Sequence, residues 1–573
     1  MIPGGLSPSL SHDELRRRVT RRHAELKRLR DNRGVGPLIE DLTLHFRPLD
    51  ASEERERTRS DSGKKKPRII DNCGRLAVRD LGAGLMSGMT NPARPWVGLK
   101  VRDQALMETG AVKTWLAACV KQILSIFESS NIYRLLPDIY EDLGVVGTSC
   151  LLLREDYRAV VWGELVPWGD YCIARDNRGQ VDTLYRDLKM TVGQVVQEFG
   201  VDAVSQVVRN HHQAGRLDTE IDVVHAIEPN PDFKPDRKDG PSKRYLSVYF
   251  EQAAETAHVL ETGGYDRFPA IVVRWRNVER SAYGRPAALD ALDDSRQLQV
   301  MHVSLGQAVA KMINPPLVAA GQSKFGAVST QPGAVNYTDA LGGAAGPQIA
   351  PLLTVRPDIS PMVAQMQDVR ERIGDALFRT LWRAVSQLET VRTATEIEAR
   401  KQEQMLLLGP VLDSLNKELL TPLIEWVWAA ATEAEILPPP PEDIAGQALE
   451  VEFRSMLASA QRSVAVGSIE RLAGFVGQMA QAFPEALMKI DPQQAVDEFA
   501  DAIGAPVRMV RSDEDVAAMQ KAQAQQQQQM QMMQMMQQGA QTAQTLSQSD
   551  MGGDNALSRI SAALSGAGGN GNG

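Results

Sequence analysis

The sequence predicts a mixed α+β protein built from several regions. The chain has 573 residues, far more than a single hydrophobic core can organise. Residues 145–290 contain short apolar runs of strand length, among them "TSCLLL", "AVVWGELV" and "YCIA". The segments on either side carry apolar side chains at helical spacing, and 43% of all residues are hydrophobic. These observations favour large cores that combine sheets with long helices.

Composition narrows the class of protein. The net charge of −9 gives no overall nucleic-acid footprint. The four cysteines show no paired spacing, so we expect buried thiols in a reducing compartment. No signal peptide is recognisable, and no apolar run approaches the length of a membrane helix. The sequence therefore predicts a soluble protein without a membrane partner.

A helix is expected over residues 11–31, because Ser11 and Glu14 form a capping box. Its apolar face consists of Leu15, Val19, Leu26 and Leu29, and arginines and lysines fill the other faces. One interpretation is a basic arm that binds nucleic acid. We favour an amphipathic helix that docks on its neighbour and exposes its charges to solvent. The charged run at 51–68 is expected to be a flexible loop.

The stretch "GAGLMSGMTNPARPWVGL" at 82–99 nearly matches a dinucleotide-binding fingerprint. That fingerprint requires a strand before the glycines and a helix after them. Here a helix over 69–90 contains the glycines and two prolines follow, so we expect close helix packing and a buried Trp96. "DSGKKK" at 61–66 also lacks the spacing of a phosphate loop.

The β-rich region continues with a hairpin at "DNRG" (176–179) and a helix at 191–200. Further strands are expected in "IDVVHAIEP", "RYLSVYF" and "FPAIVVRW". Two helices of nearly equal length then follow at 290–313 and 359–381. They bracket 314–358, which holds six prolines, six glycines and few charges. This arrangement predicts a stalk that carries a small tip.

Residues 382–394 interrupt the helical pattern, and a long helix is expected from 395 to about 436. Pro410 and Pro422 should each kink it. Another helical region covers about 455–505, and the Gln/Met-rich tail from 519 is expected to be mostly disordered. The methionines of this tail could bind Cu(I), but a Gln/Met helix or a disordered tail is the better interpretation.

Motifs of known chemistry are missing from the sequence. It has no H-E-x-x-H, no Cys/His cluster and no G-x-S-x-G, and its eight histidines are scattered. We therefore expect a structural protein with no catalytic residues, no metal site and no cofactor.

Five separated segments resemble the portal, or head-to-tail connector, proteins of short-tailed double-stranded DNA bacteriophages. They run in the family's order between about residues 10 and 515. They are "GLMSGMTNPARPWVGL", "DLGVVGTSCLLL", "YCIARDNRGQVDTLYRDLKMT", "FPAIVVRWRNVERSAYGRPAALDAL" and "VRTATEIEAR".

The resemblance implies a ring, usually of twelve subunits, at one capsid vertex, through which viral DNA is packaged and ejected. It also divides the chain into a wing, a stem, a clip, a tunnel loop, a long wing helix with the segment after it, a crown and a tail. In this sequence the wing corresponds to 1–289, the stem to 290–313 with 359–381, the clip to 314–358 and the tunnel loop to 382–394. The long wing helix with the segment after it corresponds to 395–454, the crown to 455–518 and the tail to 519–573.

Within that frame the tunnel loop carries the candidate DNA-contacting residues Arg383, Gln387 and Arg392. Salt bridges of the two arginines to Glu389 or to a neighbouring subunit are an equally good interpretation. The candidate docking residues of the clip are Val318, Phe325, Tyr337 and Ala350.

The implied partners are further copies of the chain, double-stranded DNA, the terminase packaging motor, tail adaptors, and the major capsid and scaffolding proteins. The implied location is the virion, at the head-tail junction, after assembly in the host cytoplasm. Two alternatives remain. A tail adaptor ring is usually shorter and lacks a stalk with a tip, and a nucleotide-dependent packaging enzyme needs a phosphate loop after a strand.

Overall fold

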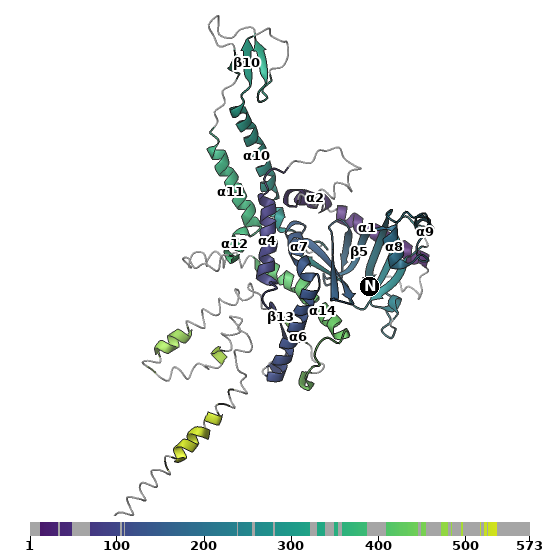
Figure 1. Ribbon diagram of the computed structural model, residues 1–573, viewed down its shortest axis with the longest axis vertical. Coiled ribbons are helices and arrows are strands. Elements are labelled where there is room, and N and C mark those ends of the chain that lie inside the picture. The colour runs from purple at the N-terminus through teal and green to yellow at the C-terminus, as the bar shows by residue number, and fades with distance from the viewer. Residues whose placement is uncertain are drawn as a thin grey trace, which may run out of the picture.

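A computed structural model describes most of the first 453 residues and several short pieces after them (Figure 1). The described ranges are 12–32, 35–47, 69–103, 106–107, 109–237, 239–254, 258–278, 281–320, 329–338, 349–352, 358–386, 408–444, 449–453, 472–479, 483, 494–496, 516, 519, 521–523, 525–533 and 535. The fold combines a body of helices and small sheets with a long projecting arm (Figure 1). This mixed composition confirms the predicted α+β class.

Helix α1 (His12–Asn32) lies on a five-stranded sheet and buries Leu15, Val19 and Leu26, whereas Leu29 stays 42% exposed. The predicted docking of this helix on its neighbour is therefore confirmed, but not all of its charged side chains are exposed to solvent. Arg16 donates to the carbonyl oxygens of Glu251 and Ala254, at 3.0 and 2.7 Å. Arg18 and Lys27 also form ion pairs with Glu228 and Asp187 of the sheet, which argues against a free basic arm.

The five-stranded sheet is antiparallel in the order β4-β5-β6-β7-β8. Its hairpin turn has Gly179 at φ +84°, a conformation that glycine adopts without strain. The helix predicted at 191–200 is α8 (Val192–Phe199), which Thr191 caps and Gly200 ends. The strands are β4 (Tyr171–Arg175), β5 (Val181–Thr191), β6 (Glu220–Pro229), β7 (Tyr245–Glu251) and β8 (Glu261–Tyr265).

Two further sheets complete the body. A three-stranded antiparallel sheet has the order β3-β2-β9, with β2 (Thr148–Asp156) between β3 (Val160–Val166) and β9 (Ala270–Arg274). Strand β1 (Val97–Val101) pairs with β13 (Leu449–Phe453), more than 340 positions later in the chain. The sequence analysis did not predict this pair, because each strand is only 5 residues long.

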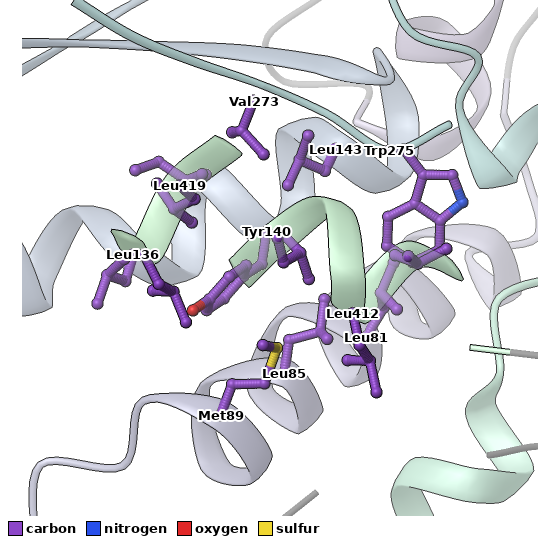
Figure 2. Close-up of a cluster of buried hydrophobic side chains, with 14 of the residues drawn as sticks. Leu81, Leu85, Met89, Leu136, Tyr140, Leu143, Val273, Trp275, Leu412 and Leu419 are labelled. Atoms are coloured by element: carbon purple, nitrogen blue, oxygen red, sulfur yellow. The ribbon is translucent and has the colours of Figure 1, made fainter. Parts of the chain in front are cut away.

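The largest core forms where α4 (Cys73–Met89) crosses α7 (Ile132–Val145) and residues 408–420 (Figure 2). Leu81 and Leu85 of α4 meet Tyr140 of α7 there. A Cβ on Gly82 would lie 3.3 Å from the carbonyl oxygen of Pro137, so the glycine permits a close approach of two backbones. Close packing by this glycine is thus confirmed, and Trp96 is 2% exposed, as expected.

Helix α6 (Gly110–Ser129) is long and apolar enough to cross a membrane by length and composition alone, contrary to the expectation from sequence. Its apolar side chains have another use in the fold. Leu116, Ile123 and Phe127 are buried in the main core, and Lys121 and Glu128 lie on the exposed side. A core helix of this kind satisfies the same criterion.

The four cysteines are buried free thiols, as predicted.

The arm consists of two paired helices that carry a small sheet at the tip (Figure 1). The helices are α10 (Leu292–Ile313) and α11 (Ser360–Ala376). One helix was expected over 359–381, but α11 ends at Ala376 and α12 (Arg379–Ser386) begins after Phe378. Phe378 has φ +56°, so the chain changes direction there and cannot continue the helix. The predicted equal lengths are also wrong, with 22 residues in α10 and 17 in α11.

The long helix is described from residue 408 and ends with α14 (Thr421–Glu433). Its predicted apolar face is confirmed, since Leu408, Leu415 and Leu423 are fully buried. A π-helical turn, Asn416–Leu420, lies directly before Pro422. Proline lacks an N–H and its ring crowds the preceding turn, so a widened turn accommodates it. Residues 395–407, where this helix was expected to begin, lie outside the described part.

Beyond residue 453 the structure describes only short pieces. Residues 472–479 are helical, and most of the expected crown lies outside the described residues. In the tail, which was expected to be mostly disordered, residues 525–533 are helical and exposed. Glutamine and methionine are good helix formers, and a Gln/Met helix was one of the two interpretations given for this stretch.

Candidate functional site

The arm joins the body at the carboxylate of Asp71, just before α4. Arg370 of α11 donates to this carboxylate at 2.8 and 3.0 Å, and Nε2 of His302 of α10 lies 2.8 Å from it. Burial opposes ionisation of Asp71. The amide of Cys73 and the side chains of Arg370 and His302 outweigh burial and lower the pKa of Asp71 to about 2. One carboxylate thus links both arm helices to the body.

Gln299 of α10 strengthens this joint through the backbone. Its Oε1 accepts hydrogen bonds from the amides of Ile70 and Asp71, at 2.8 and 3.0 Å, and its Nε2 donates to the carbonyl of Asp71. Gln299 is buried, so these bonds are protected from water. Further along α10, from Val300 to Ile313, no residue is buried in the single chain.

Helix α12 returns from the arm to the body and packs across α4. Trp382 is buried there, and Gly84 leaves the room for its ring, because a Cβ at this position would overlap it. Nε of Arg379 donates to Asp80 at 2.8 Å. The second glycine of the "GAG" motif therefore accommodates an indole ring instead of a phosphate.

A buried ion pair links the β-rich body to the long helix, and the sequence analysis did not find it. Arg274 of β9 donates to both carboxylate oxygens of Glu418, at 2.6 and 3.1 Å. Glu418 lies in the π-helical turn, and Arg274 is only 5% exposed. A single acid among surface acids on a helix gives no sequence signal of a partner 144 positions away.

Among the three candidate DNA-contacting residues, the structure describes only the backbone of Arg383. It lies in helix α12, whereas a loop was expected to begin at residue 382. The apolar positions Leu381 and Trp382 are buried against the body and continue the helix. Gln387 and Arg392 lie outside the described residues, so the structure does not bring the three together.

The candidate docking residues lie in the sheet at the tip, except Phe325, which lies outside the described part. Val318 of β10 (Leu317–Ala320) pairs with Ala350 of β12 (Ile349–Pro351). Tyr337 lies on the neighbouring strand β11 (Val335–Thr338) and is 50% exposed. Three of the four candidates therefore share one small sheet, on adjacent strands.

A groove of about 870 Å³ lies between α14, β1 with β13, and the loop after β8. Trp115, Trp426 and Trp428 line it, with a run of prolines at 438–440. Nε1 of Trp115 donates to the carbonyl of Pro438 at 2.9 Å, which fixes one wall. Such an aromatic lining is suited to apolar contact.

The fold is thus a body of helices and small sheets from which a long two-helix arm projects. The sequence matches the family described as bacteriophage head to tail connecting protein over residues 16–510. It is 40% identical over 509 residues to a protein of Bordetella phage BPP-1 named "Probable portal protein", covering 89% of this chain and 91% of that protein. It is 37% identical over 503 residues to the "Portal protein" of Salmonella phage epsilon15, covering 87% and 90%.

The chain therefore belongs to the bacteriophage head to tail connecting proteins. This membership confirms the resemblance found in the sequence. It makes the chain a structural connector of the virion and excludes the alternative of a nucleotide-dependent packaging enzyme.

Proposed function

We propose that twelve copies of this chain close into a ring at one capsid vertex, and that double-stranded DNA passes through its centre during packaging and ejection. The two relatives named portal proteins support this role. The observation that carries it is the arm, which leaves large apolar side chains exposed along both helices. Val300, Ile313 and Val363 are 66, 79 and 47% exposed in the single chain. Neighbouring arms would cover these side chains, as in a closed ring of head-to-tail contacts.

Charge supports a passage for DNA more than a tight binding site. Each copy carries a net charge of −9, so twelve copies would carry about −108. Many phosphate-neutralising contacts would hold DNA strongly and oppose its movement. We assign the α10–α11 pair to the stem and the sheet at its tip to the clip, with residues 1–289 as the wing. The segment 382–394 becomes the tunnel loop, which begins as the end of α12.

The partners follow from these positions along the axis. The clip would dock the terminase motor during packaging and the tail adaptors afterwards. The wing would face the major capsid and scaffolding proteins, and assembly would take place in the host cytoplasm. The segment after residue 455 would form the crown.

Electron microscopy of the purified full chain tests the ring. We expect closed rings with a central channel. A monodisperse monomer at micromolar concentration, over several salt concentrations, would contradict the proposal.

The double variant Arg383→Ala/Arg392→Ala tests the tunnel loop. We expect unchanged rings and adaptor binding, with altered packaging or retention of DNA, because phosphate contacts are lost. The control is Arg17→Ala/Arg28→Ala, which removes two exposed arginines from α1. Normal packaging by the tunnel-loop variant would refute the assigned role, and lost adaptor binding would refute the placement of loop and clip.

A further inference from the structure

The sheet at the tip of the arm has two different edges. Central strand β10 runs parallel to β11 and antiparallel to β12. The order β11-β10-β12 leaves β11 and β12 as the outer strands among the strands that the structure describes. An outer strand presents backbone N–H and C=O groups that can pair with another chain.

The register places the apolar residues of this sheet on one face. Ala319 lies opposite both Tyr337 and Ile349, so these three form one row across the sheet. Val335, Leu317 and Pro351 form a second row on that face, two residues along.

The outer strands carry no charged side chain, although both are short, with 4 and 3 residues, and β12 ends in Pro351, which lacks an N–H. Tyr337 is 50% and Ile349 61% exposed, and Val335 is 47% exposed. The described residues between 314 and 352 include no Asp, Glu, Lys or Arg. Free edges are commonly guarded by charged side chains, and an exposed apolar edge without them tends to pair with another strand.

We propose that β11 of each copy pairs with β12 of the next copy, which joins the tip sheets into one continuous belt around the ring axis. This inference rests on the proposed ring, because copies related by a rotation about that axis point the same way. In such copies β11 and β12 run in opposite directions, so their pairing is antiparallel. The row of Ile349, Ala319 and Tyr337 then continues from Tyr337 into Ile349 of the neighbouring copy.

The dimensions of a belt agree with a channel. Three strands at about 4.8 Å each occupy about 14 Å of circumference per copy. Twelve copies give about 170 Å, or a backbone diameter of about 55 Å, and strand tilt widens the belt further. This leaves room for a DNA duplex inside. The alternative, β11 pairing with β11 of another copy, requires a two-fold axis and cannot repeat around a ring.

Cysteine crosslinking of the full chain tests the pairing. In the double variant Tyr337→Cys/Ile349→Cys, the thiol at position 337 of one copy lies opposite the thiol at position 349 of the next copy. Their spacing suits a disulfide. The four native cysteines are buried, so they should contribute little background. After oxidation we expect a ladder of covalent oligomers on a non-reducing gel, which reduction abolishes.

The two single variants are the matched controls, and neither should form the ladder, because a head-to-tail contact never brings identical residues together. A second pair, Tyr337→Cys/Pro351→Cys, covers a slip of two residues, which keeps the same face. Rings seen by electron microscopy without crosslinking in either pair would overturn the belt and leave the ring intact. Crosslinked dimers from a single variant would overturn it in favour of a two-fold contact. Absence of rings would overturn both the belt and the proposed function.

Discussion

Arg274 on β9 and Glu418 in the π-helical turn form two parallel hydrogen bonds, 2.6 and 3.1 Å long, between a strand of the body and the long helix. Asn277 donates to the same carboxylate at 2.9 Å, and Arg274 also donates to the carbonyl of Gly179. The pair therefore links strand β9 of the three-stranded sheet to the π-helical turn before Pro422. A bidentate geometry of this kind is among the stronger ion pairs in proteins.

Glu418→Ala should destabilise the fold by about 3 kcal/mol, because it leaves the Arg274 guanidinium buried without its partner. The neighbouring Lys417→Ala is the control, since Lys417 and Asp413 form an exposed pair with side chains 73 and 61% accessible. That pair should contribute less than about 1 kcal/mol. Thermal unfolding of both variants measures the difference, and equal shifts in melting temperature would show that Arg274–Glu418 has no special role.

Asp71→Asn should remove part of the acid sensitivity of the fold. The pKa of Asp71 is lowered to about 2 in the folded chain, from an ordinary value of 3.8. A lowered pKa stabilises the fold above the unfolded value, and this stabilisation disappears as the pH falls from about 4 towards 2. The free energy of unfolding of the wild type should therefore fall by roughly 1–2 kcal/mol over that pH range. The variant lacks this contribution at every pH, so it should not show that fall.

Melting temperatures at pH 5 and pH 2.5 provide the measurement for Asp71. Asp368→Asn, on an exposed part of α11, is the control and should keep the wild-type pH dependence. A steeper loss of stability in the Asp71 variant than in the wild type would show that the sign of the argument is wrong.

Gly84→Ala should displace α12 from α4, because the added methyl group overlaps the ring of Trp382. Overpacking of this kind costs about 1–3 kcal/mol. Gly306, also in a helix, has no atom near its Cβ position in the single chain, so Gly306→Ala should stabilise α10 by up to about 1 kcal/mol. Calorimetry distinguishes the two, and a loss from Gly306→Ala would indicate that a neighbouring copy packs closely on it.

Deleting residues 519–573 should leave ring assembly intact. The described helical residues 525–533 are exposed, so the deletion removes no buried contact from the part that the structure describes. Ordering such a segment costs about 1–2 kcal/mol per residue in backbone entropy, which few apolar contacts offset here. Electron microscopy of the truncated chain tests this, and the appearance of monomers alone would show that the tail is structural.

Local patterns in the sequence were sufficient for most elements. The alternation and turn residues around "DNRG" predicted the β4–β5 hairpin, and the helix predicted at 191–200 corresponds to α8. The helical face of 408–427 was also visible in the sequence, because its apolar residues repeat every three or four positions. The break at Phe378 was not, since left-handed backbone at an aromatic residue has no sequence signal.

The sequence by itself determined the class of the chain, the order of its elements and the uncharged tip between two helices, because these depend on spacing and composition along the chain. Only the tertiary structure decided which distant residues meet. Asp71 with Arg370, Arg274 with Glu418 and Gly84 with Trp382 are each joined across 140 positions or more. Such contacts depend on how whole helices and sheets pack, and packing selects partners by shape and burial in three dimensions, which spacing along the chain does not encode.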